Sequence, residues 1–192
     1  MKLLVKPLCC CYAGTFLALA TRDGNNEVVV LAFVICLKED GPNYKYMTKG
    51  CHKVDGLTPY LNRATQCCYS DRQKGIPFFG KEFDAVMANC IVHLIKNCRV
   101  WIRDQKKLGN IPGSARCDFP AKPIHDMQKE HTEEGFRKKL ERFKKGFPYA
   151  GHYFETNPTH DKTYLYAILR RGVTTHLHNT SNVAEITMGL LK

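Results

Sequence analysis

The sequence has no uninterrupted run of about 18 apolar residues, the length that a membrane helix requires. The first residues, MKLLVKPLCCCYAGTFLALA, have the composition of a signal peptide, but Lys6 and Pro7 interrupt the apolar stretch. The chain also has no internal repeat and no low-complexity segment. We therefore expect a soluble protein of the cell interior or nucleus that is not secreted and has no membrane partner.

Acidic residues are scarce. The 192 residues include 18 Asp and Glu against 29 Lys and Arg, a net charge of +11. Such an excess favours nucleic acid or another acidic surface as partner, although surplus lysine also serves solubility alone. The length suits one domain.

The ten cysteines are not spaced as in a secreted disulfide framework. They occur as a run at 9–11, as the pair Cys67-Cys68, and singly within apolar segments. This distribution indicates reduced thiols in an intracellular protein.

Hydrophobic patterning predicts three amino-terminal strands. Two apolar runs flank Arg22-Asp23-Gly24-Asn25-Asn26, a turn typical of a β-hairpin. Residues 28–37 are apolar without alternation, as in a strand covered on both faces. With KLLVKPL in front, the first third is predicted to form a meander.

The remainder predicts helices alternating with two short strands. NYKYMTKG is expected to be helical with Asn43 as N-cap, and a second helix is expected from Thr58 as N-cap and Pro59 at the first helical position. TQCCYS is a predicted strand ending at Asp71. A helix in FFGKEFDAV, a strand in MANCIV and a helix near His93 follow.

The segment 109–123 is rich in Gly and Pro, which predicts an irregular boundary. Beyond it, HTEEGFRKKLERFKKG predicts an amphipathic helix capped by Thr132, with Phe136, Leu140 and Phe143 on one face. KTYLYAILRRG and NTSNVAEITMGLLK are also predicted to be helical.

Four ordered blocks together resemble the central ribonuclease H-like domain of Mutator-like element (MULE) transposases: GTFLALATRDGNNEVVVLAFVICLKEDGPNYKYM, SDRQKGI, NCIVHLIKN and TSNVAEI. The resemblance covers nearly the whole chain. It implies an α+β fold with a mixed five-stranded sheet, flanking helices and a helical insertion before the last acidic helix. The implied division is a core at 1–108, an insertion at 109–178 and a carboxyl-terminal core helix at 179–192.

The same resemblance implies a DDE-type site for DNA transposition. In this family two aspartates and one glutamate hold two divalent metals that activate the attacking oxygen and stabilise the leaving oxygen. Asp71 matches the second aspartate and Glu185 the glutamate, and both would bind Mg²⁺ or Mn²⁺ as hard oxygen ligands. Without the resemblance, Asp71 is an ordinary turn residue and Glu185 a solvated helical acid.

The first aspartate of that triad is missing. Its place, some eight residues before Tyr12-Ala13-Gly14, falls near Leu4, and MKLLVKPLCCC contains no acid. The remaining pair would hold metal weakly, and we expect an inactive, transposase-derived DNA-binding protein, unless Asp23 or Asp55 replaces the lost ligand. The alternative is a domesticated scaffold for binding or interaction without enzymatic activity.

Cys90 and His93 match the family's Cys-x-x-His. Zinc would need two further ligands, so a buried structural cysteine and a hydrogen-bonded histidine are the preferred interpretation, and a zinc cofactor is not expected.

Basic residues of the predicted insertion are candidates for phosphate contacts that read no sequence. A solvated helix face is the alternative, because Glu133, Glu134 and Glu141 share the helix. A second copy of the chain, in a homo-oligomer, is a further candidate partner. The nucleic-acid candidates are Arg72, Lys74, Arg137, Lys138, Lys139, Arg142, Lys144, Lys145, Arg170 and Arg171.

Overall fold

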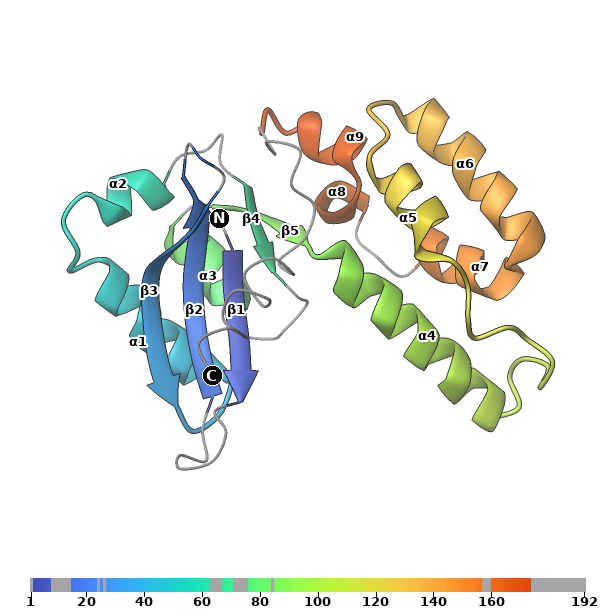
Figure 1. Ribbon diagram of the computed structural model, residues 1–192, viewed down its shortest axis with the longest axis horizontal. Coiled ribbons are helices and arrows are strands. Elements are labelled where there is room, and N and C mark those ends of the chain that lie inside the picture. The colour runs from blue at the N-terminus through green and yellow to red at the C-terminus, as the bar shows by residue number, and fades with distance from the viewer. Residues whose placement is uncertain are drawn as a thin grey trace. The chain divides into compact units, whose positions relative to one another are not determined.

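The computed structural model is of the mixed α+β class, as expected (Figure 1). It describes residues 2–7, 15–23, 25, 27–62, 67–70, 76–83, 85–156 and 160–173. Contacts divide the chain into a strand unit of residues 1–90 with 173–192 and a helical unit of residues 91–172.

The strand unit is built on a mixed sheet in the order β3-β2-β1-β4-β5. The antiparallel pairs β1–β2 and β2–β3 form the predicted meander, whereas β4 runs parallel to both β1 and β5. The link between β1 and β4 is the pair Lys2↔Tyr69. The strands are β1 (Lys2–Pro7), β2 (Thr15–Arg22), β3 (Val28–Cys36), β4 (Cys67–Ser70) and β5 (Val86–Asn89).

Three helices accompany these strands, and their apolar side chains form a core with one face of the sheet. The helices are α1 (Gly41–Cys51), α2 (Leu57–Leu61) and α3 (Ile76–Glu82). Leu17 and Leu19 of β2 belong to the same buried cluster as Tyr44 of α1 and Phe79 of α3. Because successive strand residues point to opposite faces, this cluster uses alternate positions of β2.

Two predicted helix starts are wrong by a few residues. The N-cap of α1 is Asp40, whose Oδ1 accepts a hydrogen bond from the backbone N–H of Asn43 at 3.1 Å, so the aspartate displaces Asn43 from that role. The N-cap of α2 is Gly56, which has a φ of 74°. That left-handed conformation suits glycine, and it places Thr58 inside the helix.

The helical unit begins with α4. The predicted division had assigned this segment to the core at 1–108. Its apolar residues, including Leu94 and Cys98, lie in one core with residues of the later helices, so α4 groups with them from Ile91 onward. The helices are α4 (Ile91–Lys107), α5 (Ala121–Gln128), α6 (Glu133–Gly146), α7 (Pro148–Thr156), α8 (His160–Thr163) and α9 (Leu165–Leu169).

Aromatic side chains dominate the core of the helical unit. Phe136 of α6 lies with its ring centroid 4.2 Å from that of Tyr164 and 5.3 Å from that of Tyr166. Phe119, Phe143 and other buried rings extend the cluster. Aromatic rings bury large areas and add specific edge and offset contacts, so this core fixes how α6 lies against α9.

None of the helices within the described ranges has both the length and the apolar character of a membrane span.

Candidate nucleic-acid interface

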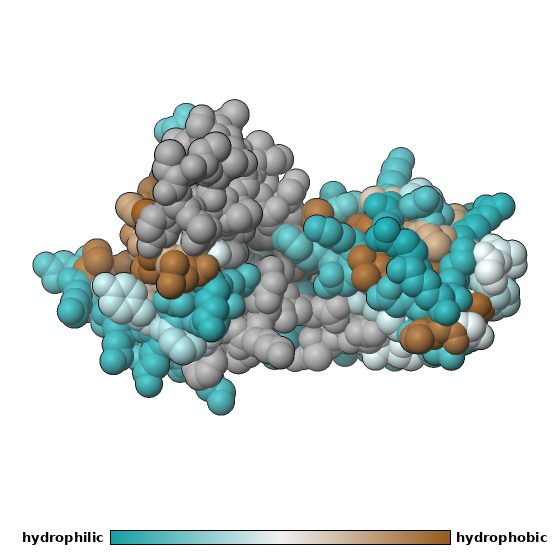
Figure 2. All heavy atoms as spheres, turned by 90° about the horizontal axis from the view of Figure 1, so that it is seen from below, coloured by the Kyte–Doolittle hydropathy of each residue, from teal (hydrophilic) through white to brown (hydrophobic). Residues whose placement is uncertain are grey.

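Most of the net charge resides in the helical unit. Residues 91–172 contain 17 Lys and Arg and 9 Asp and Glu, a net charge of +8 out of the chain's +11. Figure 2 shows that hydrophilic residues predominate on one face of this unit. A unit of this charge attracts polyanions over about a Debye length.

Helix α6 carries six of these cations and begins where the sequence predicted. The hydroxyl of Thr132 accepts a hydrogen bond from the backbone N–H of Gly135 at 3.1 Å, and Glu133 and Glu134 occupy the first turn. Both features stabilise a helix amino terminus. Phe136, Leu140 and Phe143 are buried, as predicted.

Three of the six cations of α6 are held in ion pairs. Arg137 donates from Nε and Nη2 to Oε1 of Glu133, at 2.9 and 2.7 Å. Lys139 pairs with Glu130, and Lys144 donates to Glu141 and to Glu155 at 3.1 Å. Their charge is largely compensated within the protein.

The other three cations, Lys138, Arg142 and Lys145, form an exposed stripe. Their spacing of i, i+4 and i+7 aligns them along one side of the helix, opposite the buried residues Phe136, Leu140 and Phe143. Within the ranges that the structure describes, no carboxylate pairs with any of them. This stripe, Lys138/Arg142/Lys145, is the part of α6 whose cations have no carboxylate partner among the described residues.

A second exposed stripe, which was not predicted, lies on α4. Lys96, Arg103 and Lys107 are exposed and spaced i, i+7 and i+11, again on one side of a helix. Their periodicity was the signal that would have identified them once α4 was recognised as a helix of this length.

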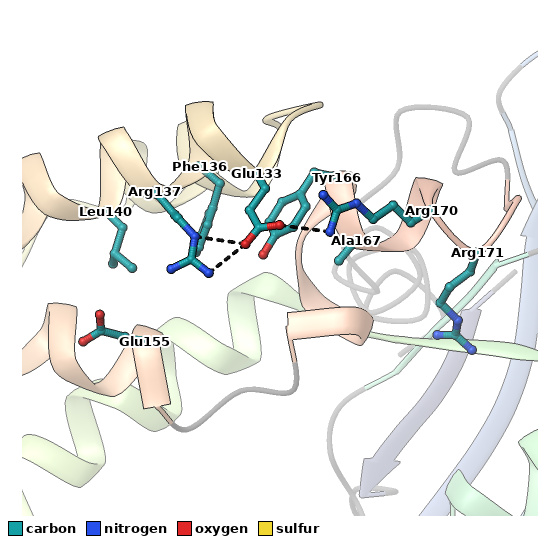
Figure 3. Close-up of a pocket in the computed structure, with 9 residues that line it drawn as sticks. All are labelled: Glu133, Phe136, Arg137, Leu140, Glu155, Tyr166, Ala167, Arg170 and Arg171. Carbon is teal, nitrogen blue, oxygen red and sulfur yellow. Dashed lines mark hydrogen bonds and ion pairs between the residues drawn. The ribbon is translucent and has the colours of Figure 1, made fainter.

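Arg170 and Arg171 follow α9 and lie beside α6 at an open cavity of about 570 Å³. Arg170 donates from Nη1 to Oε2 of Glu133 at 2.9 Å, so Glu133 bridges two guanidiniums (Figure 3). Hydrogen bonds from Arg137 and then from Arg170 lower the pKa of Glu133, which therefore stays ionised. The structure thus brings Arg137 and Arg170 together at Glu133, and Arg171 is a further lining residue of the same cavity.

No protein-family model matches the chain, and no curated protein matches it. The family resemblance therefore rests on the four sequence blocks alone.

The predicted metal ligands Asp71 and Glu185, together with Arg72 and Lys74, lie outside the described residues. Of the two candidates to replace the missing aspartate, Asp23 is engaged in the turn between β2 and β3. Its Oδ1 accepts backbone N–H bonds from Asn25 and Glu27 at 2.9 and 2.8 Å. Asp55 lies exposed between α1 and α2.

Cys90 and His93 fall on either side of the start of α4. Cys90 is buried, and its backbone N–H donates to the carbonyl of Ser70 at 2.7 Å, continuing the contact between β5 and β4. His93 is half-buried in the first turn of the helix. Within the described part of the chain, no three His, Cys, Asp or Glu side chains are grouped closely enough to hold a metal.

Proposed function

We propose that this chain is a transposase-derived DNA-binding protein whose helical unit contacts the phosphate backbone through the Lys138/Arg142/Lys145 stripe. The observation that carries the proposal is the division of the cations on α6. Three form ion pairs within the protein, and three lie on the side opposite the core without a carboxylate partner in the described part of the chain. Exposed, unpaired cations at helical spacing contact phosphates without reading sequence.

The ribonuclease H-like ancestry is part of the same proposal. The sheet order β3-β2-β1-β4-β5, with three antiparallel strands followed by two parallel ones, supports it. So does the place of Asp71, which directly follows Ser70, the last residue of β4. Lys2 pairs with Tyr69, so the strand carrying Leu4 is the neighbour of the strand that precedes Asp71.

The proposed protein binds DNA but cuts it poorly. Two-metal transfer needs carboxylates on both sides of the metal pair, and the position near Leu4 supplies none. A binding scaffold without catalysis is therefore the favoured present role, with Mg²⁺- or Mn²⁺-dependent cleavage and strand transfer as the ancestral activity.

A matched pair of variants tests the interface. Lys138→Gln with Lys145→Gln removes two unpaired charges, whereas Lys139→Gln with Lys144→Gln removes two paired charges from the same helix. Binding of a 30-base-pair duplex is measured by fluorescence anisotropy at several salt concentrations. The first variant should bind at least about tenfold more weakly and lose roughly 2 from the slope of log K against log salt, at about 0.9 per phosphate contact.

The second variant should bind nearly as the unchanged protein does, with circular dichroism confirming that both variants fold. Equal losses in the two variants would show that net charge, not this stripe, determines binding, and would overturn the proposed interface.

A further inference from the structure

The cavity between α6 and α9 has cationic walls. Arg137 comes from α6 and Arg170 from the turn after α9, and their side chains are 69% and 66% exposed (Figure 3). Arg171 also lines the cavity. The guanidiniums of Arg137 and Arg170 thus meet at one opening within the helical unit, whereas that of Arg171 points away from them (Figure 3). Arg is the side chain best suited to phosphate geometry.

The acids at this cavity do not cancel its positive charge. Glu133 offsets one of the two guanidiniums that it bridges. Glu155 accepts hydrogen bonds from the ammonium of Lys144 at 3.1 Å through both carboxylate oxygens, so its charge is already matched. The lining therefore keeps an excess of positive charge.

Both arginines retain donors for a ligand. Arg137 uses Nε and Nη2 toward Glu133, and Arg170 uses Nη1, which leaves Nη1 of Arg137 and Nε and Nη2 of Arg170 without partners among the described residues. The guanidinium of Arg170 also lies over the ring of Tyr166, with Cζ 5.6 Å from the centroid. Stacking and ion pairing together hold these donors in place, which lowers the entropic cost of binding.

The rest of the lining is apolar and large enough for more than an inorganic ion. Phe136, Leu140 and Ala167 contribute to the wall, and the volume of about 570 Å³ falls within the roughly 300–1,000 Å³ typical of small-molecule sites. An apolar surface beside charged donors suits a ligand with a phosphate at one end and a ring at the other.

A purely structural role for Arg137 and Arg170 does not explain why both contact the same carboxylate. Exposed ion pairs contribute little to stability, so linking α9 to α6 does not require two arginines on one carboxylate. Burial of Phe136 against Tyr164 and Tyr166 already joins these helices.

We propose that this cavity is a phosphate subsite that holds the phosphoryl group of a nucleotide, with Arg137 and Arg170 as its ligands. This inference rests on the proposed DNA-binding function. If the protein binds DNA, the nucleotide in the subsite is the 5′-phosphorylated end of a DNA strand. The apolar wall would contact the sugar or base of that terminal nucleotide.

Isothermal titration calorimetry of the full chain with dAMP, deoxyadenosine and inorganic phosphate tests the site. We expect dAMP to bind, inorganic phosphate to bind more weakly, and deoxyadenosine to give no saturable heat. Arg137→Gln and Arg170→Gln should each weaken dAMP binding about tenfold or more, because each removes charge-assisted donors. Arg170→Lys should recover only part of the affinity, and Arg116→Gln, at an exposed arginine of the helical unit that does not line this cavity, should leave dAMP binding unchanged.

A pair of oligonucleotides that differ only at the 5′ end, which carries either a phosphate or a hydroxyl, tests whether the bound phosphate is that of a DNA strand end. Tighter binding of the phosphorylated end, lost in Arg170→Gln, supports the strand end as ligand. If dAMP gives no saturable heat, or if Arg116→Gln weakens dAMP binding as much as Arg170→Gln does, the subsite is refuted. If the protein binds duplex DNA but not dAMP, the phosphate subsite is refuted and the proposed DNA-binding function is retained. If it binds dAMP but not duplex DNA, the DNA-binding function is refuted and the subsite is retained.

Discussion

Arg170, after α9, donates a 2.9 Å hydrogen bond to Glu133 in the first turn of α6, although the two residues are 37 positions apart in the chain. Arg137 binds the other oxygen of the same carboxylate. One acid thus orients two guanidiniums at the edge of the cavity. The charge of Glu133 therefore positions both guanidiniums, while its own contribution to the stability of the helical unit is small.

The stability of the helical unit should respond to acid through Glu133. Its folded pKa lies below the ordinary value of 4.5, so its contribution to stability is present above about pH 4.5 and is lost as the pH falls through the lower folded pKa. Glu133→Gln should slightly lower the melting temperature at pH 7 but not at pH 3. Circular dichroism melts at both pH values measure this.

Glu134→Gln is the matched control, because Glu134 is the exposed neighbour of Glu133 and forms no ion pair with any residue that the structure describes. It should change the melting temperature little at either pH. A Glu133→Gln deficit that persists at pH 3 would assign the effect to packing instead of charge.

Histidine 125 should add a separate acid sensitivity at higher pH. Burial, followed by the nearby Lys129, lowers the pKa of His125 below its usual 6.5. Between the lowered folded pKa and pH 6.5, His125 is protonated in the unfolded chain but neutral in the folded chain. The free energy of unfolding is therefore unaffected above pH 6.5 and falls as the pH drops from 6.5 toward the folded pKa. His125→Gln should remove this part of the loss, as judged by urea denaturation at pH 7.5 and 5.5.

The aromatic core of the helical unit should be highly sensitive to truncation. Phe136 is 1% exposed and contacts two tyrosine rings. Phe136→Ala should cost about 3–5 kcal/mol, the usual range for a buried Phe. Leu169→Ala, at a residue that is 38% exposed, serves as control and should cost much less. Urea titrations followed by far-UV circular dichroism compare them.

Buried thiols should resist alkylation in the folded protein. Burial raises the pKa of both Cys68 and Cys98 to about 12, which suppresses the reactive thiolate. Cys117 is only half-buried. Iodoacetamide followed by peptide mass spectrometry should modify Cys117 first among these three, and in urea all three should react alike. Fast native labelling of Cys68 would contradict the buried position of β4.

Helices and strands could be predicted where the signals for them lie within the segment itself. Apolar runs around a turn indicated β2 and β3, and Thr132 with an amphipathic repeat indicated α6. In contrast, neither α5 nor α7 was predicted, and α5 begins inside the segment 109–123, whose Gly and Pro content indicated irregular structure. Pro123 and Pro148 lie in first turns, where the missing N–H has no helical partner to lose.

The candidate site could be predicted only in part. The basic residues of α6 were evident from the sequence, but which of them are neutralised depends on Glu130, Glu155 and Arg170. Glu155 and Arg170 reach α6 only through tertiary packing of α7 and α9, which no local pattern encodes. The distinction between paired and unpaired cations therefore came from the structure.

Restoring a carboxylate on β1 should recover metal binding if the proposed ancestry is correct. Leu4→Asp places an acid on the strand that pairs with β4, at the position where the resemblance expects the missing aspartate. Titration calorimetry should then show Mn²⁺ binding at least about tenfold tighter than in the unchanged chain, because oxygen ligands determine affinity for such hard ions. Combining Leu4→Asp with Asp71→Asn should abolish the gain.

Leu3→Asp is the control. Adjacent strand residues point to opposite faces of a sheet, so only one of the two introduced carboxylates can share a metal with Asp71. Circular dichroism must show that each variant folds, because β1 is the central strand of the sheet. Equal Mn²⁺ affinities in Leu3→Asp and Leu4→Asp would mean that the gain is nonspecific. A specific gain with Leu4→Asp, accompanied by Mg²⁺-dependent nicking of supercoiled plasmid, would indicate that loss of one carboxylate separates this chain from an active enzyme.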